Sequence, residues 1–88
     1  MIEKIGEPAM LEQLAEEASE LAQAALKLAR KLRRENPTPK TFEECKANLR
    51  EEYTDVVQCA RELMLIPDEH QIARKHRRFE ERWEEDPN

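Results

Sequence analysis

The chain has 88 residues, of which 40% are charged, and 15 Lys and Arg stand against 20 Asp and Glu, giving a formal net charge of −5. A chain this short forms one domain at most and buries only a modest core, which favours an oligomer. The acidic balance argues against general nucleic-acid binding. Because no run of 18 apolar residues and no signal-peptide core is present, we expect a cytoplasmic protein that does not span a membrane.

The first predicted helix covers roughly residues 8–34. Pro8 suits its first turn, and Lys31, Arg33 and Arg34 suit its last turn. The segment ENPTPK then ends the helix with two prolines. Apolar residues recur along the helix at alternating spacings of three and four, which predicts one packed stripe. That stripe comprises Leu11, Leu14, Ala18, Leu21, Ala25, Leu28 and Leu32.

Two further helices follow the prolines. Thr41 and Glu44 form a capping-box pattern that starts the second helix, and Asp68 with Gln71 caps the third. The apolar stripe of the second helix is Cys45, Leu49, Tyr53, Val56, Ala60 and Leu63. The stripe of the third is Ile72, His76, Phe79 and Trp83, of which Phe79 and Trp83 are expected to pack and His76 to be structural. Cys45 and Cys59 form no CxxC motif and are expected to be packing residues.

These elements predict an all-α fold, with an antiparallel helical hairpin and a third helix. The domain covers residues 1–88, with its core at about 8–83 and a frayed tail at 84–88. The apolar face of the hairpin is too wide for one short helix to cover. We therefore expect a homodimer or a dimer of dimers to complete a helical bundle.

Two pairs of acids stand out on the first two helices, in EEASE (residues 16–20) and EEYTD (residues 51–55). Glu17 and Glu20 share one helix face, as do Glu52 and Asp55, and such like-charged pairs repel each other. With Asn36 at the middle of the hinge, a symmetric hairpin places both pairs at one height and on one side. Four carboxylates gathered in one place need a cation, and oxygen ligands alone suit Mg²⁺, Mn²⁺ or Ca²⁺.

The residues Glu16, Glu17, Glu20, Glu52 and Asp55 match the EExxE and ExxD motifs of a known family. Together with the surrounding text LEQLAEEASELAQAALKL, NPTP and LREEYTDVVQCARELM, the chain resembles the MazG-like branch of the all-α nucleoside triphosphate pyrophosphohydrolases. The resemblance covers roughly residues 10–83, although the gap between the two motifs is longer than is usual in the family.

The resemblance implies an enzyme that hydrolyses a nucleoside triphosphate to the monophosphate and pyrophosphate. It implies Mg²⁺, for which Mn²⁺ can substitute, held by Glu17, Glu20, Glu52 and Asp55, and a role near the attacking water for Glu16. In KHRRFEER, Lys75, Arg78 and Arg82 match the spacing of the family's phosphate-facing basic residues, whereas Phe79 stands where Asn is common. Surface ion pairs with Glu80, Glu81 or Glu84 are the competing interpretation of these three cations.

Two alternatives to this function stay open at the level of sequence. One is a non-catalytic, self-associating helical module of the same fold that binds another protein. The other is a related enzyme of the phosphoribosyl-ATP pyrophosphohydrolase or dUTPase type, which shares the metal chemistry and differs in its pocket. The base and sugar preference is not encoded in any motif that we recognise.

Overall fold

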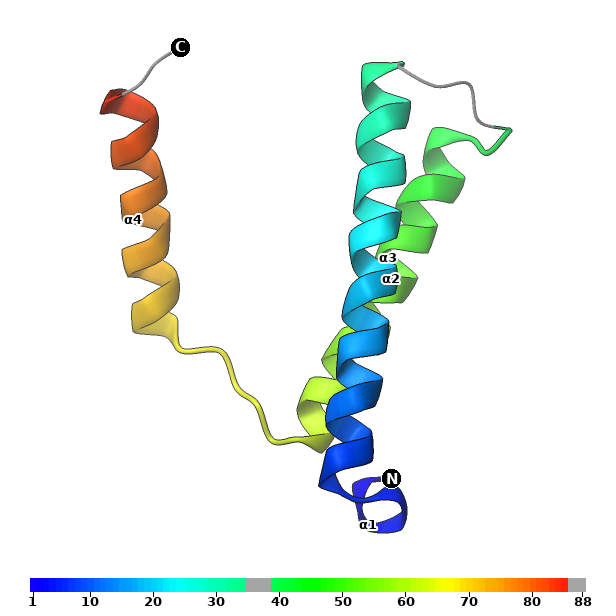
Figure 1. The fold of residues 1–88 in the computed structure, drawn as a ribbon. Coiled ribbons are helices and arrows are strands. Elements are labelled where there is room, and N and C mark those ends of the chain that lie inside the picture. The colour runs from blue at the N-terminus through cyan, green and yellow to red at the C-terminus, as the bar shows by residue number, and fades with distance from the viewer. Residues whose placement is uncertain (35–38, 86–88) are drawn as a thin grey trace.

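The structure is a computed structural model that describes residues 1–34 and 39–85. These residues form four helices and no strand: α1 (Ile2–Ile5), α2 (Glu7–Arg33), α3 (Phe42–Glu62) and α4 (Glu69–Glu85) (Figure 1). The predicted all-α class is therefore confirmed. The predicted hinge centre at Asn36 and the last three residues of the predicted frayed tail lie outside the described residues.

Local sequence accounts for both ends of α2. Gly6 has φ 89°, a left-handed conformation that suits glycine, and it separates α1 from α2. Pro8 lies in the first turn, where its missing N–H costs no hydrogen bond. At the other end, basic side chains occupy the last turn, and the left-handed Arg34 donates its backbone N–H to the carbonyls of Arg30 and Lys31. Only α1 was not expected from the sequence.

The predicted caps of the next two helices are both confirmed. The hydroxyl of Thr41 accepts a hydrogen bond from the Glu44 N–H at 3.1 Å, and the Thr41 N–H donates to the Glu44 carboxylate at 2.9 Å. A cap of this kind stabilises a helix by about 1 kcal/mol. Before α4, Asp68 Oδ1 accepts from the Gln71 N–H at 3.0 Å. Both helices therefore begin where their side chains satisfy otherwise unpaired backbone donors.

Helices α2 and α3 pack against each other as the antiparallel hairpin that the sequence predicted. The buried or half-buried positions recur at spacings of three and four on both helices, as in left-handed coiled-coil packing. On α2 they include Met10, Leu14, Glu17, Leu21, Ala24, Leu28 and Lys31, and along α3 and its C-cap they include Cys45, Leu49, Glu52, Val56, Cys59 and Leu63. Glu17 and Glu52 therefore belong to the packed faces.

The packed face of α2 is only partly the predicted apolar stripe. Leu14, Leu21 and Leu28 lie on it, but Leu11 is 48% exposed and Leu32 is 62% exposed. Ala18 and Ala25 are exposed as well. The reason is that α2 carries two neighbouring stripes with the same periodicity, and α3 covers the one that contains Met10, Glu17 and Ala24.

Helix α4 stands apart from the hairpin (Figure 1). All its side chains from Glu69 to Glu84 are exposed, so the packing predicted for Phe79 and Trp83 is not found: they are 67% and 68% exposed. His76, predicted to be structural, is exposed and lies 2.8 Å from the Glu80 carboxylate. No helix among residues 1–34 and 39–85 is both long enough and apolar enough to cross a bilayer.

The protomer is open for its size. Its radius of gyration is 16.7 Å, against about 12 Å for a compact domain of this length. Its accessible surface is 7827 Å², against about 5,400 Å² for a compact monomer of this mass. In the described part of the chain, the only buried apolar residues are Met10, Ala24, Cys45 and Cys59. Much apolar surface is thus left without a partner inside one protomer.

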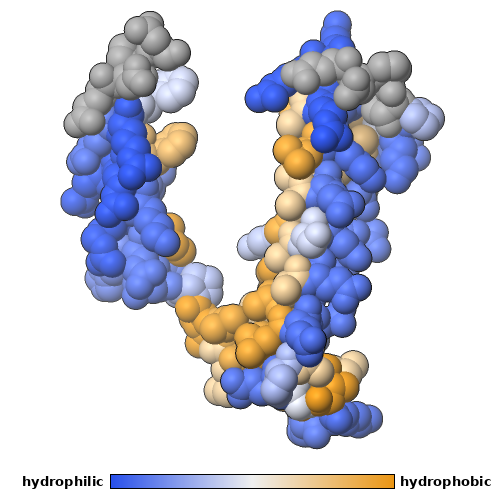
Figure 2. Space-filling view, in the orientation of Figure 1, coloured by the Kyte–Doolittle hydropathy of each residue, from blue (hydrophilic) through white to orange (hydrophobic). Residues whose placement is uncertain are grey.

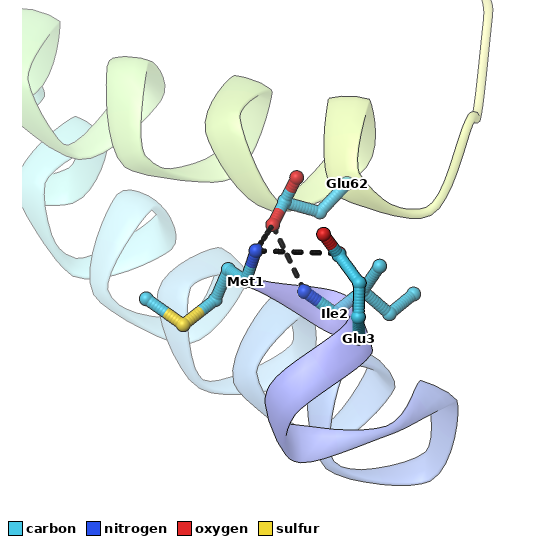
Figure 3. Close-up of polar contacts among 4 residues, drawn as sticks. All are labelled: Met1, Ile2, Glu3 and Glu62. Carbon is cyan, nitrogen blue, oxygen red and sulfur yellow. Dashed lines mark hydrogen bonds and ion pairs between the residues drawn. The ribbon is translucent and has the colours of Figure 1, made fainter.

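The short helix α1 is tied to the end of α3 by one carboxylate (Figure 3). Glu62 Oε1 lies 2.9 Å from the amino group of Met1 and accepts a hydrogen bond from the Ile2 N–H at 3.0 Å. The hydrogen bond from the amino group is the largest cause of the lowered pKa of Glu62, followed by the one from Ile2. This contact lies at the end of the hairpin where α2 begins and α3 ends.

Candidate metal centre

Three of the predicted acidic ligands converge on the hairpin. Glu17 and Glu20 of α2 and Glu52 of α3 each place a carboxylate oxygen within 4.8 Å of the other two. We call these three residues the carboxylate cluster. Glu17 and Glu52 are half-buried in the packed faces of the two helices, whereas Glu20 lies one turn further along α2 and is exposed. The cluster therefore sits at the edge of the interhelical seam, with one side open to solvent.

Two oxygens of the cluster are shielded from solvent and lack a donor. Glu17 Oε2 and Glu52 Oε2 have no hydrogen-bond partner within the part of the chain that the structure describes. The other oxygen of Glu17 accepts a hydrogen bond from Gln13 Nε2 at 2.8 Å. A shielded carboxylate oxygen without a donor is costly, and a bound cation would offset that cost. The donor set fits a hard divalent cation, because all three ligands are carboxylates.

The pKa of Glu20 is raised above its ordinary value. The largest cause is the hydrogen bond that a protonated Glu20 shares with Glu52, and the next is repulsion between the two carboxylates. Partial burial and the charge of Glu16 act in the same direction. The fold therefore resists the ionisation of Glu20 when no cation is bound.

This shift predicts how stability depends on pH in the absence of divalent ions. Because the folded chain holds the Glu20 proton more tightly than the unfolded chain, this contribution is complete below the ordinary pKa of 4.5 and is lost as the pH rises through the raised folded pKa. We expect Glu20→Gln to reduce this loss, as measured by urea unfolding in EDTA at a series of pH values. Glu51→Gln is the control, because Glu51 is exposed and does not contribute to the pKa of Glu20. Equal pH profiles for the parent and Glu20→Gln would contradict the prediction.

Asp55, the fourth predicted ligand, lies outside the carboxylate cluster. It is half-buried on α3 and lines a shallow hollow together with Leu21, Leu49 and Tyr53. Its side chain is one methylene shorter than that of Glu, and it lies one turn beyond Glu52. Glu16, the predicted residue near the water, is exposed on α2 beside the cluster.

Two residues near the cluster were not predicted as part of its surroundings. Gln13 orients Glu17 through its amide, and only the spacing of four residues on one helix could have indicated this contact.

Cys59 is buried on α3. Burial, followed by the charges of Glu17, Asp55 and Glu62, raises the pKa of its thiol. The raised pKa keeps the thiol protonated, which agrees with the expectation of a packing residue.

The three predicted phosphate-binding cations lie on α4. Lys75, Arg78 and Arg82 are exposed, and α4 stands apart from α2 and α3 in the protomer (Figure 1). The fold of one chain thus assembles the acidic half of the predicted site and leaves the basic half on a separate helix. Among the described residues of α4, His76 Nε2 lies 2.8 Å from the carboxylate of the neighbouring Glu80.

Comparison of the chain with known proteins identifies no relative. No family model, no curated protein and no solved structure matches the chain. The carboxylate cluster is therefore the feature from which a function has to be inferred.

Proposed function

We propose that the protein is a Mg²⁺-dependent nucleoside triphosphate pyrophosphohydrolase that converts a (d)NTP and water to the monophosphate and pyrophosphate. The carboxylate cluster carries this proposal. Three carboxylates from two helices lie within 4.8 Å of one another, and two of their oxygens are shielded without a donor. Maintaining such repulsion on a small hairpin is costly unless a cation occupies the site.

In this proposal Glu17, Glu20 and Glu52 hold the ion, and Asp55 is the fourth ligand after a change in its side-chain rotamer. When bound, Mg²⁺ would neutralise charge on the phosphate oxygens and lower the pKa of a water molecule. Because Glu17 and Glu52 belong to the packed seam, their positions are held by the helix packing. Glu20, which faces solvent, leaves one side of the site accessible to a substrate.

The remaining roles fall to exposed residues. Glu16 lies beside the cluster and has a free acceptor for a proton from the attacking water. Lys75, Arg78 and Arg82 would bind the triphosphate, which carries negative charge that the acidic hairpin alone repels. These cations reach the substrate only when α4 lies against a hairpin. The basic half of the site therefore requires closure of the protomer or a contribution from a second chain.

A second candidate function is a non-catalytic, self-associating helical module that binds another protein. The observation that favours it is the large exposed apolar surface, which includes Met64, Ile66, Phe79 and Trp83 at 84%, 86%, 67% and 68% exposure. An enzyme of the phosphoribosyl-ATP pyrophosphohydrolase or dUTPase type shares the carboxylate cluster and would differ in its nucleotide pocket.

Product analysis distinguishes these functions. With Mg²⁺ and a panel of common and damaged dNTPs, we expect monophosphate and pyrophosphate, measured by ion-exchange chromatography of the reaction mixture. Replacing Mg²⁺ by EDTA should abolish both products. Release of orthophosphate and diphosphate would contradict the proposed bond cleavage. A folded protein without turnover on the whole panel would favour the binding module.

A further inference from the structure

Two exposed apolar faces of the protomer lie on either side of the gap between α2 and α4. The first, which we call the alanine face, lies on α2 beside the packed seam and comprises Leu11, Ala15, Ala18, Ala22, Ala25 and Leu32. The second, which we call the aromatic face, lies on α4 and comprises Ile72, His76, Phe79 and Trp83. In the space-filling view, apolar surface borders the gap on both the α2 side and the α4 side (Figure 2).

The two faces match in spacing and in shape. Ala18, Ala22 and Ala25 follow one another at intervals of four and three residues, and so do Ile72, His76 and Phe79 of the aromatic face. Helices that share this repeat keep their faces in contact along their length. Ala side chains leave room for the large rings of Phe79 and Trp83, so one face offers small residues where the other offers large ones.

The charges of the two helices also match, provided that they run in the same direction. The first half of α2 is acidic, with Glu12, Glu16 and Glu20, and its second half is basic, with Lys27 and Arg30. Helix α4 has the opposite order, because its basic residues at 74–78 precede Glu80, Glu81 and Glu84. Within one chain α2 and α4 run the same way (Figure 1), so a two-fold axis along the helices makes each α4 parallel to the α2 of the other copy and sets unlike charges side by side.

From these matches we infer that two copies of the chain exchange α4, so that the aromatic face of each copy covers the alanine face of the other. A helix of 17 residues whose side chains from Glu69 to Glu84 are exposed is marginal in water. Residues 63–68, in which Met64 has φ 56°, connect α3 to α4 and hold α4 away from α2 of the same chain. Exchange of α4 between two copies does not require this connecting segment to change its conformation. A reciprocal exchange covers both alanine faces in one closed, two-fold assembly.

The available area is sufficient for such an assembly. The protomer exposes 7827 Å², which is about 2,400 Å² more than a compact monomer of this mass exposes. Stable interfaces bury about 800 Å² on each partner, and obligate dimers bury more. The exchange extends the proposed function without depending on it, because neither face includes a residue of the carboxylate cluster.

Adjacent substitutions on α2 test the alanine face. Ala22 lies on the face and Gln23 lies beside it, and both are exposed in the protomer. We expect a dimer for the parent and for Gln23→Glu, and a rise of at least about 100-fold in the dimer dissociation constant for Ala22→Glu, because only Ala22→Glu places a charge in the interface. Light scattering and analytical ultracentrifugation give the mass, and circular dichroism verifies that each variant is helical. A monomeric parent, or equal dissociation constants for the two variants, would overturn the inference.

Cross-linking distinguishes exchange from closure of α4 onto its own α2. The double variant Ala18→Cys/His76→Cys places one thiol on each face and keeps Phe79 and Trp83, while the native Cys45 and Cys59 stay buried. A short bis-maleimide should give a covalent dimer on a denaturing gel, and the parent should give none. A monomer whose peptide map joins residues 18 and 76 of one chain would overturn the exchange, as would the absence of any link between these two positions.

Discussion

Replacing Glu52 by Gln is expected to lower dNTP turnover by at least about 100-fold, because a carboxamide is a much weaker ligand for Mg²⁺ than a carboxylate. Glu52 is half-buried, and one of its oxygens lies within 4.8 Å of oxygens of both Glu17 and Glu20. The neighbouring Glu51 is exposed and is not part of the carboxylate cluster. Glu51→Gln changes the net charge by the same amount and should leave turnover within about twofold of the parent.

The measurement is pyrophosphate release by the parent and both variants at a Mg²⁺ concentration that saturates the parent, with circular dichroism as the folding control. Raising the Mg²⁺ concentration should recover part of the activity of Glu52→Gln, since the substitution weakens binding of the ion. If both variants lose activity equally, net charge rather than ligation governs the rate. If Glu52→Gln is as active as Glu51→Gln, the carboxylate cluster is not the active centre.

Glu52→Gln is also expected to stabilise the metal-free protein, by about 1 kcal/mol, the scale of a like-charge contact near a protein surface. The substitution removes one charge from the cluster, and its amide can donate a hydrogen bond to the shielded oxygen of Glu17 that now lacks a donor. Glu51→Gln removes a charge that is exposed and should change the free energy of unfolding by less than about 0.5 kcal/mol.

Urea unfolding in EDTA, followed by circular dichroism at one protein concentration, gives these free energies. A fixed concentration matters because association contributes to the stability of a dimer. A Glu52→Gln variant that is less stable than the parent without metal would mean that Glu52 stabilises the hairpin by some other contact. The interpretation of the cluster as a strained cation site would then be wrong.

Helix ends and the acidic convergence could be predicted from the sequence because each depends on short-range rules. Thr41, Glu44 and Asp68 cap their helices through hydrogen bonds that span three residues. The convergence of Glu17, Glu20 and Glu52 required in addition only that the hairpin close symmetrically. The helical period and the equal distances from the predicted hinge anticipated three of the four acids, whereas Asp55 lies outside the cluster.

The arrangement of α2 and α4 could not be predicted in the same way. Two stripes with one period lie side by side on α2, and periodicity alone does not determine which of them α3 covers. The stripe that packs against α3 half-buries Glu17, which hydropathy would place outside, and the arrangement leaves Leu11 and Leu32 exposed. The amphipathic pattern of α4 indicates that its aromatic face packs against a partner. The pattern does not indicate whether that partner belongs to the same chain.

The most direct test of the carboxylate cluster needs no substrate. Melting curves of the parent, Glu52→Gln and Glu51→Gln are recorded with EDTA and with millimolar Mg²⁺, since an ion that binds only the folded state raises the melting temperature. A cation site in the cluster predicts that Mg²⁺ stabilises the parent and Glu51→Gln and has little effect on Glu52→Gln. Equal responses of all three proteins to Mg²⁺ would contradict a metal site formed by Glu17, Glu20 and Glu52.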